Sequence, residues 1–279
     1  MLVHYVYPPI LNGKKIAKLM KIQGKTVVVT GGASGIGLGL VKRFKAEGAA
    51  NIVIADISQQ ELDQYADELG VTACLCDVSK ESDVKNLIDT TIEKFGRIDL
   101  FCGNAGIFIR GGVETPNEGW DRIWGINVMA HVYAARHALP HMIKRGEGYF
   151  LITASAAGLL SQVGSATYSV TKHAALALAE WLLITHGAEG IKVSALCPQA
   201  VESKMTAGSD GGVAGQDGML KPENVADVVV KALDEERFII LPHPEVETYF
   251  QRKANDYQRW IRGMQRLQEQ FGNIYSEKE

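Results

Sequence analysis

The chain has 279 residues, of which 46% are hydrophobic and 22% charged, and its formal net charge is −3. These values are those of a packed globular protein, which excludes bulk disorder. The even charge balance argues against a broad nucleic-acid footprint, and no apolar run approaches the ~20 residues of a membrane helix.

The first 24 residues form a basic segment. No acidic residue precedes Glu47, whereas lysine occurs at positions 14, 15, 18, 21 and 25. A secretory signal places its charge before an apolar core, and here that order is reversed. We expect a surface arm over residues 1–24, with an organellar leader or loose attachment to an acidic membrane surface as alternatives.

Short apolar runs then alternate with longer amphipathic stretches. The runs predict buried parallel strands at residues 26–30, 51–55, 71–76, 98–102, 148–153, 191–196 and 238–241. The stretches between them predict helices at residues 35–47, 59–69, 81–95, 120–145, 166–187 and 222–235. This alternation predicts one α/β domain over residues 25–244, with helices on both faces of a parallel sheet.

The cysteines and histidines show no metal-binding pattern. No C-x-x-C or H-E-x-x-H occurs, so we expect no metal; a His137–His141 pair on one helix face is the alternative. Buried, reduced thiols in a cytoplasmic, reducing compartment are expected instead, at Cys74, Cys76, Cys102 and Cys197.

A glycine-rich turn, T-G-G-A-S-G-I-G at residues 30–37, joins the first predicted strand to the first helix. Glycines let the chain turn sharply and let a pyrophosphate approach the backbone. The new helix offers unpaired N–H groups and a positive dipole end to the anion. This context predicts a dinucleotide site with contacts from Gly31, Ser34, Gly35, Ile36 and Gly37.

Acidic residues follow the next two strands. Asp56 could accept both hydroxyls of an adenosine ribose and would repel a 2′-phosphate, or it could cap a helix, a role that Ser58 could fill instead. No Arg or Lys stands beside it or in the glycine turn, so we expect NAD rather than NADP. Asp77 is expected near the adenine or in a simple turn. Cofactor contacts are also expected from the residues after each aspartate, Ile57 and Val78.

Tyr168 and Lys172 lie four residues apart on a predicted helix and therefore share a face. Ser155 precedes them by 13 residues, just after a strand, where open α/β sheets bind ligands. Tyr249 and Lys253 have the same spacing, but they lie on a predicted helix of the tail, away from any strand end. We therefore expect the first pair to be catalytic.

The three residues suit the oxidation of an alcohol. A phenol has a pKa near ~10, so the Lys172 ammonium and a positively charged nicotinamide would have to stabilise the phenolate of Tyr168. A shift of roughly three units corresponds to about 4 kcal/mol. Lys172 could also hold the nicotinamide ribose, while the Ser155 hydroxyl would orient the substrate oxygen and stabilise its developing charge.

Together with Asn104-Ala105-Gly106 after the fourth strand, these motifs resemble the short-chain dehydrogenase/reductase family, over about residues 25–241. The glycine spacing is similar to that of the compact branch with single-domain subunits. The resemblance implies a Rossmann-type sheet of seven strands, and it implies that the Asn-Ala-Gly segment steadies the central strand beside the cofactor. Family members commonly form homodimers or homotetramers through the helices that here carry Asn127 and Tyr168.

The resemblance also implies roles for single residues. Asn127 is similar to a fourth catalytic residue that holds a water between Lys172 and solvent; an Asn bonded to backbone is the alternative. Pro198 and Val201 fit nicotinamide contacts, and Ser203 stands where Thr is common. The family usually has Pro-Gly after the sixth strand, whereas here Gln199 follows Pro198.

The substrate side is less defined. A partly apolar pocket is expected from Ile107, Phe108, Ala157, Gln162 and Gln199. The glycine-rich segment 203–219 predicts a mobile loop that closes over the substrate. The tail predicts one helix over residues 245–274, with an apolar stripe that Lys253 interrupts. This extension, 245–279, would pack on its own domain or on a second subunit.

These patterns favour an NAD-dependent oxidoreductase that acts on a secondary alcohol or ketone, a small molecule whose identity stays open. Two alternatives use the same fold: a protein that binds NAD without turnover, as a sensor or scaffold, and a non-redox enzyme such as a dehydratase or epimerase. A non-catalytic member would be expected to lose one of the three catalytic positions, and this chain keeps all of them.

Overall fold

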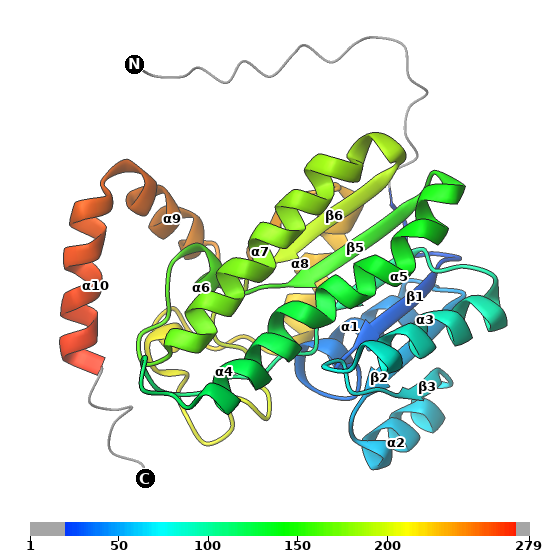
Figure 1. Ribbon diagram of the computed structural model, residues 1–279, viewed down its shortest axis with the longest axis horizontal. Coiled ribbons are helices and arrows are strands. Elements are labelled where there is room, and N and C mark those ends of the chain that lie inside the picture. Colours follow the sequence, from blue (N-terminus) through cyan, green and yellow to red (C-terminus); the bar gives the residue numbers. More distant parts are fainter. Residues whose placement is uncertain (1–19, 272–279) are drawn as a thin grey trace.

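A computed structural model describes residues 20–271 (Figure 1). Seven strands form one parallel sheet in the order β3-β2-β1-β4-β5-β6-β7. This confirms the predicted Rossmann-type α/β fold. The strands are β1 (Thr26–Thr30), β2 (Asn51–Asp56), β3 (Thr72–Leu75), β4 (Leu100–Gly103), β5 (Gly148–Thr153), β6 (Ile191–Leu196) and β7 (Ile239–Ile240).

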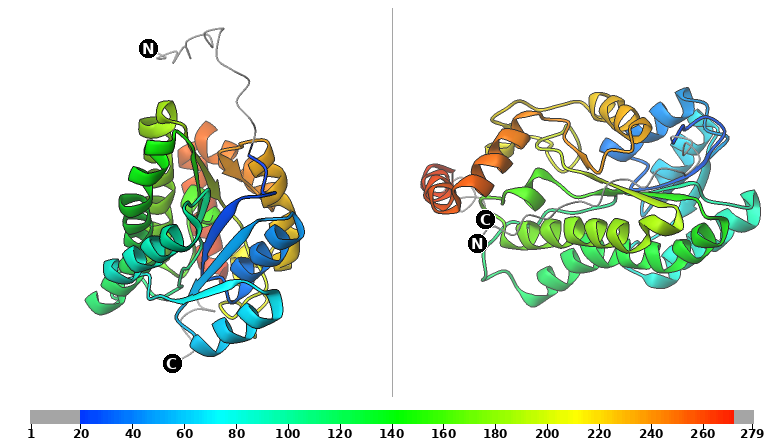
Figure 2. Two further views of the ribbon diagram at one scale, coloured as in Figure 1. Left: turned by 90° about the vertical axis from the view of Figure 1, so that its right-hand side faces the viewer. Right: turned by 90° about the horizontal axis from the view of Figure 1, so that it is seen from above.

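Helices cover both faces of the sheet (Figures 1 and 2). The α-helices are α1 (Gly35–Ala46), α2 (Gln59–Leu69), α3 (Glu81–Phe95), α4 (Asn117–Trp124), α5 (Ala130–Arg145), α6 (Ala156–Leu159), α7 (Ala166–His186), α8 (Pro222–Asp234), α9 (Glu245–Asn255) and α10 (Tyr257–Phe271). Shorter turns are η1 (Gly125–Met129), η2 (Gly187–Glu189) and η3 (Gly212–Gly215).

Two apolar clusters hold the three layers together, and both arise from the alternation of side chains along the strands. Val28 on β1 belongs to the cluster that packs against α3, α5 and α7. Its neighbours Val27 and Val29 belong to the cluster beneath α1 and α8. Because both faces of β1 are buried, the strand reads as a continuous apolar run in the sequence.

The structure corrects several predicted boundaries. The helix expected at 120–145 begins at Asn117 and is interrupted by a π-helical turn, η1. The strand expected at 98–102 begins two residues later, at Leu100, and the edge strand β7 has only two residues. The short helix α6 was not predicted, since four residues are too few to show a period.

The tail is two helices rather than one over residues 245–274. The break lies at Asp256, whose Oδ1 accepts a hydrogen bond from the backbone N–H of Arg259 at 2.9 Å. This is the geometry of an N-cap, so α10 starts afresh there. Residues 272–274 and the predicted arm 1–19 lie outside the described residues.

Within residues 20–271, none of the helices is both long and apolar enough to cross a membrane. All four cysteines are unpaired; Cys74 is half-buried and the other three are buried. Burial raises the pKa of the Cys197 thiol to about 12, which keeps it protonated and unreactive at neutral pH.

Candidate active site

The glycine turn follows β1 and needs its glycines for two separate reasons. Gly31 has a φ of +63° and Gly35 a φ of +47°, conformations that L side chains rarely adopt. A Cβ on Gly37 would lie only 2.0 Å from the Gly31 carbonyl oxygen, so the helix can pack against its own turn only with glycine there. Ser34, the N-cap of α1, makes no side-chain capping bond, which leaves the first amides of the helix open to a ligand.

Backbone amides hold the Asp56 carboxylate at the end of β2. Oδ1 accepts from Ile57 at 2.8 Å and from Ser58 at 3.4 Å, while Oδ2 accepts from Ala33 of the glycine turn at 3.3 Å. Ser58, not Asp56, caps α2, because its side chain accepts from the N–H of Glu61. Asp56 is therefore free of the capping role and fixed beside the turn.

A lysine from a distant segment reaches the same region. Lys204 forms an ion pair with Glu61 on α2, and the Glu61 and Asp56 carboxylates raise the pKa of the Lys204 ammonium. The expectation that no cation lies beside Asp56 therefore holds only for its sequence neighbours. Sequence reasoning missed Lys204 because nothing local links residue 204 to residue 56.

Asp77 occupies a turn at the start of α3. Its Oδ1 accepts from both the N–H and the hydroxyl of Ser79, at 3.1 and 2.6 Å, and these bonds lower the pKa of the carboxyl group. Its backbone N–H donates to Asp83 at 3.1 Å. Val78, next in the chain, is buried in the core, whereas Ile57 is 72% exposed.

Asn104 links three strand ends beneath the turn. Its Nδ2 donates to the Thr30 carbonyl at 3.1 Å, its backbone N–H to the Thr30 hydroxyl at 2.9 Å, and its Oδ1 accepts from Thr153 at 3.2 Å. β1, β4 and β5 are thereby tied together at their carboxyl ends. The family resemblance implies a steadying role for the whole Asn104-Ala105-Gly106 segment, and these bonds are those of Asn104.

Asn127 is fully buried in the π-helical turn η1. Its Oδ1 accepts from the Ile107 N–H at 2.9 Å, and its Nδ2 donates to the Ile107 carbonyl at 3.0 Å and to Thr171 at 3.2 Å. A Cβ added to Gly106 would lie 3.3 Å from both Asn127 Oδ1 and Lys172 Nζ. Glycine at 106 thus lets the amide and the ammonium approach each other. π-Turns of this kind occur often at functional sites.

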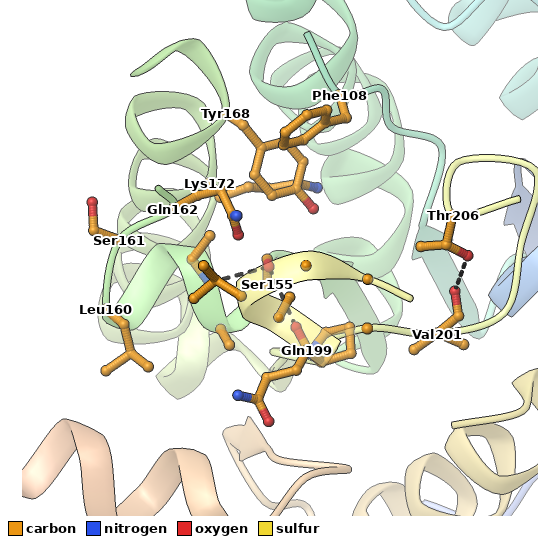
Figure 3. Close-up of a pocket in the computed structure, with 18 of the residues that line it drawn as sticks. Phe108, Ser155, Leu160, Ser161, Gln162, Tyr168, Lys172, Gln199, Val201 and Thr206 are labelled. Carbon is orange, nitrogen blue, oxygen red and sulfur yellow. Dashed lines mark hydrogen bonds between the residues drawn. The ribbon is translucent and has the colours of Figure 1, made fainter. Parts of the chain in front are cut away.

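Ser155, Tyr168 and Lys172 meet at one wall of the cavity (Figure 3). Ser155 follows β5 and caps α6, accepting from the Ala157 N–H at 3.1 Å, while its hydroxyl donates to the Pro198 carbonyl at 3.3 Å. Tyr168 lies in the first turn of α7. One turn later, Lys172 Nζ donates to the Thr153 carbonyl at 2.9 Å and lies 5.5 Å from the Tyr168 ring centroid.

The electrostatics differ from the expectation. Burial raises the pKa of Tyr168 above its usual value, and the Ser155 hydroxyl only partly opposes this effect. Burial also lowers the pKa of Lys172 to about 8. The protein alone therefore keeps Tyr168 as a phenol, because its desolvation outweighs the attraction that Lys172 was expected to provide.

A cavity of about 1050 Å³ joins these groups to the glycine turn. The predicted residues on its walls are Gly31, Ser34, Gly35, Ile36, Asn104, Ala105, Gly106, Phe108, Ser155, Ala157, Gln162, Tyr168, Lys172, Pro198, Gln199, Val201 and Ser203. The structure places the other predicted residues outside the walls: Gly37, Asp56, Ile57, Asp77, Val78, Ile107 and Asn127. Several of these residues lie behind the walls and contact the neighbouring backbone, as Asn127 does by accepting a hydrogen bond from the Ile107 N–H.

Gln199 connects the cavity wall to the tail. Its side chain points away from Tyr168 and Lys172 (Figure 3), and Nε2 donates to Asp217 Oδ2 at 2.9 Å. Asp217 Oδ1 in turn accepts from the Tyr249 hydroxyl at 2.9 Å. Asp217 of the 203–219 segment thus links Gln199, the residue that departs from the family pattern, to Tyr249 on α9. Tyr249, which sequence reasoning set aside, is a wall residue.

Lys253 holds α9 in place, and it is not an interruption of the apolar stripe. Only 9% of the residue is exposed, and Nζ donates to the carbonyls of Leu159 and Leu160 at 2.7 and 3.0 Å. These carbonyls end α6, so the ammonium meets a negative dipole end there. Trp260, Met264 and Leu267 of α10 then face the cavity. Within the described residues, Lys253 thus joins α9 to the end of α6 in the same chain.

Known proteins share this architecture. The family model described as short chain dehydrogenase matches residues 25–212. A 1-deoxy-11-beta-hydroxypentalenate dehydrogenase from Streptomyces exfoliatus is 36% identical over 87% of this chain and 91% of its own length. The meso-2,3-butanediol dehydrogenase of Serratia marcescens is 36% identical over 68% of this chain and 76% of its own.

Solved structures of other proteins have the same fold. A short-chain dehydrogenase/reductase from Burkholderia phymatum in complex with NAD has a TM-score of 0.79 at 28% identity, covering 86% of this chain and 96% of its own. The 3-ketoacyl-(acyl-carrier-protein) reductase of Brucella melitensis, complexed with NADH, has a TM-score of 0.73 at 28% identity, covering 79% and 97%. The chain belongs to the short-chain dehydrogenase family of oxidoreductases.

Proposed function

We propose that this protein moves a hydride between NAD and a secondary alcohol or the matching ketone. The observation that carries the proposal is one cavity that joins Ser155, Tyr168 and Lys172 to the glycine turn. The turn fits a dinucleotide, since its glycines keep the backbone bare and the amides of α1 face outward. Bound there, the nicotinamide supplies the hydride chemistry.

The side chains supply the proton chemistry. For ketone reduction, the Tyr168 hydroxyl donates its proton to the substrate oxygen; for alcohol oxidation, the same oxygen takes the proton back. Ser155 Oγ holds the substrate oxygen and stabilises its developing charge. Lys172 Nζ stabilises the deprotonated Tyr168 when its own proton is present. Asn127 completes the proposed set by holding a water between the Lys172 ammonium and solvent. This role is supported by its closeness to Lys172, since a Cβ on Gly106 would lie 3.3 Å from both Asn127 Oδ1 and Lys172 Nζ.

The preference for NAD is proposed to come from Asp56. Its carboxylate is fixed by three backbone amides next to the turn, where it would bind ribose hydroxyls and repel a 2′-phosphate. Lys204 opposes this effect only weakly because Glu61 pairs with it. Asp56→Ala should weaken NAD binding, and it should reduce the preference for NAD over NADP, measured as the ratio of their dissociation constants, about tenfold. An undiminished preference for NAD in that variant would remove Asp56 as the selector.

The direct test is nicotinamide absorbance with the purified full chain, NAD and NADP separately, and a panel of secondary alcohols and ketones. Stoichiometric change of the nicotinamide spectrum with product supports the oxidoreductase. Tight NADH binding with no turnover on any panel member would favour the sensor, and product formed without spectral change would favour a non-redox enzyme.

A cytoplasmic homo-oligomer is also proposed. The outer surface of α7 exposes large apolar side chains, with Val170 at 46%, Trp181 at 55% and Ile184 at 82% exposure. Such a patch is typical of an interface between subunits. Light scattering after size-exclusion chromatography would give the mass, and a monomer at micromolar concentration would contradict the assembly.

A further inference from the structure

Three arginines of the tail helices line the cavity: Arg252 on α9, and Arg259 and Arg266 on α10. The cavity therefore has a strongly basic wall in a protein whose net charge is −3. Among all its lining residues there are six Lys or Arg and three Asp. Figure 1 and the right-hand view of Figure 2 show α10, which carries two of these arginines, well away from α1, the helix that follows the glycine turn.

These three guanidinium groups lack a carboxylate partner within 4.0 Å in the described residues, unlike those of Arg43, Arg97, Arg136 and Arg237. Arg43, for example, pairs with both Glu47 and Asp227. A run of unpaired arginines facing a cavity leaves planar, bidentate donors available for an anion.

The acidic residues of the cavity are engaged elsewhere. Asp217 accepts from Gln199 and Tyr249, Asp256 accepts from the N–H of Arg259, and Asp210 accepts from Gly212. Each of these carboxylates serves the loop or the helix start that it belongs to. None of them forms an ion pair with a tail arginine in the described residues, so an anionic ligand meets open donors.

Apolar side chains lie on the same walls as the arginines. Trp260, Met264 and Leu267 face the cavity from α10 and are half-buried. Phe108, whose ring centroid is 5.1 Å from that of Tyr168, continues the apolar surface toward the catalytic hydroxyl. A ligand that spans this cavity would thus meet a reactive end, an apolar middle and a basic end.

We propose that the substrate is an apolar alcohol or ketone that carries an anionic group, carboxylate or phosphate, bound by Arg252, Arg259 and Arg266. The inference rests on the proposed oxidoreductase function and names its substrate class. The reacting carbon lies at Ser155 and Tyr168 while the anion lies at the tail. The tail extension that the core motifs do not include is then the part of the chain that selects the substrate.

The experiment uses matched ketones that share one apolar skeleton and end in a carboxylate, its methyl ester or a phosphate monoester. kcat/KM is measured for the full chain and for Arg259→Gln, the triple variant R252Q/R259Q/R266Q and the control Arg262→Gln. Arg262 lies on α10 but is not on the cavity wall, so it matches charge and helix.

The wild type should prefer an anionic ketone over the ester by at least about tenfold, the worth of one charged hydrogen bond. The triple variant should bring that ratio near one, Arg262→Gln should leave it unchanged, and high salt should reduce it. The anion is identified as the one, carboxylate or phosphate, whose ketone has the larger kcat/KM relative to the ester. A ratio near one in the wild type, or an equal loss of preference in Arg262→Gln, would overturn the inference.

Failure of the proposed function would look different. If no ketone is turned over with either nicotinamide, calorimetric binding of the acid and the ester to wild-type and triple-variant protein still tests the subsite. Tighter binding of the acid that disappears in the triple variant supports it. Equal binding of the two ligands rejects it.

Discussion

The two ends of the cavity, the proposed cofactor end and the proposed substrate end, are built in opposite ways. The cofactor end is made by eight consecutive residues, 30–37, with Asp56 and Asn104 bonded directly to the backbone around them. The substrate end is made by segments far apart in sequence, such as α6, residues 203–219, α9 and α10. Local geometry therefore defines the first end, whereas the second depends on side-chain bonds such as Lys253 to the end of α6. A single sequence motif can therefore specify the cofactor end, whereas the substrate end forms only when distant segments pack together.

The largest effect should come from the residue between the two ends. Tyr168→Phe removes the hydroxyl and should lower kcat by about 10² to 10⁴. The dissociation constant of NADH, measured by fluorescence, should change less than about twofold, because the phenyl ring keeps its contact with Phe108. Turnover near the wild-type rate would show that Tyr168 is not the acid and base.

The variant Gly37→Ala should weaken NADH binding at the cofactor end without changing the substrate end. The new Cβ would lie 2.0 Å from the Gly31 carbonyl oxygen, so the turn or α1 must move. NADH should bind about a hundredfold more weakly, a loss of about 3 kcal/mol. Gly96→Ala is the control for glycine loss outside the site, since nothing lies within 4 Å of its Cβ. NADH affinity should then be unchanged, although the positive φ of Gly96 costs stability. Wild-type affinity in Gly37→Ala would show that the turn can adjust.

Lys172 should leave a signature in the pH dependence of stability. Its pKa is lowered to about 8 in the folded protein, so between pH 8 and 10.5 the unfolded chain binds more protons. The free energy of unfolding should therefore rise with pH in that window, by up to about 3 kcal/mol relative to Lys172→Met. Urea titrations of both proteins without cofactor at pH 7.5 and 10 measure this difference. A difference that stays flat with pH would mean that burial does not disfavour the ammonium.

The variant Lys253→Met should weaken ketone binding at the substrate end without changing the cofactor end. The variant keeps the aliphatic length but leaves two carbonyls at the end of α6 without their donor, which costs about 1–3 kcal/mol. KM for a ketone should rise several-fold while NADH affinity stays within about twofold. Lys231→Met, on the exposed surface of α8, is the matched control. Equal losses for ketone and NADH would mean that the two ends of the cavity are coupled.

Much of the fold follows from local patterns. β1 is buried on both faces and therefore appears as an uninterrupted apolar run, and Ser58 caps α2 where a serine precedes a helical stretch. The break at Asp256 could also have been read from the sequence, since Asn and Asp favour caps over helix interiors. The π-turn at Asn127 could not, because one additional residue per turn leaves almost no trace in an apolar period of 3.6.

The sequence by itself determined the parallel sheet, the glycine turn and the set of residues expected to react, because each depends on periods and spacings within about twenty residues. Only the tertiary structure decided that Lys204 reaches α2, that Gln199 is linked to Tyr249 through Asp217, and that Lys253 is buried against α6. It also decided that burial raises the pKa of Tyr168. These outcomes depend on desolvation and on contacts between distant segments, and neither is encoded in the neighbours of a residue.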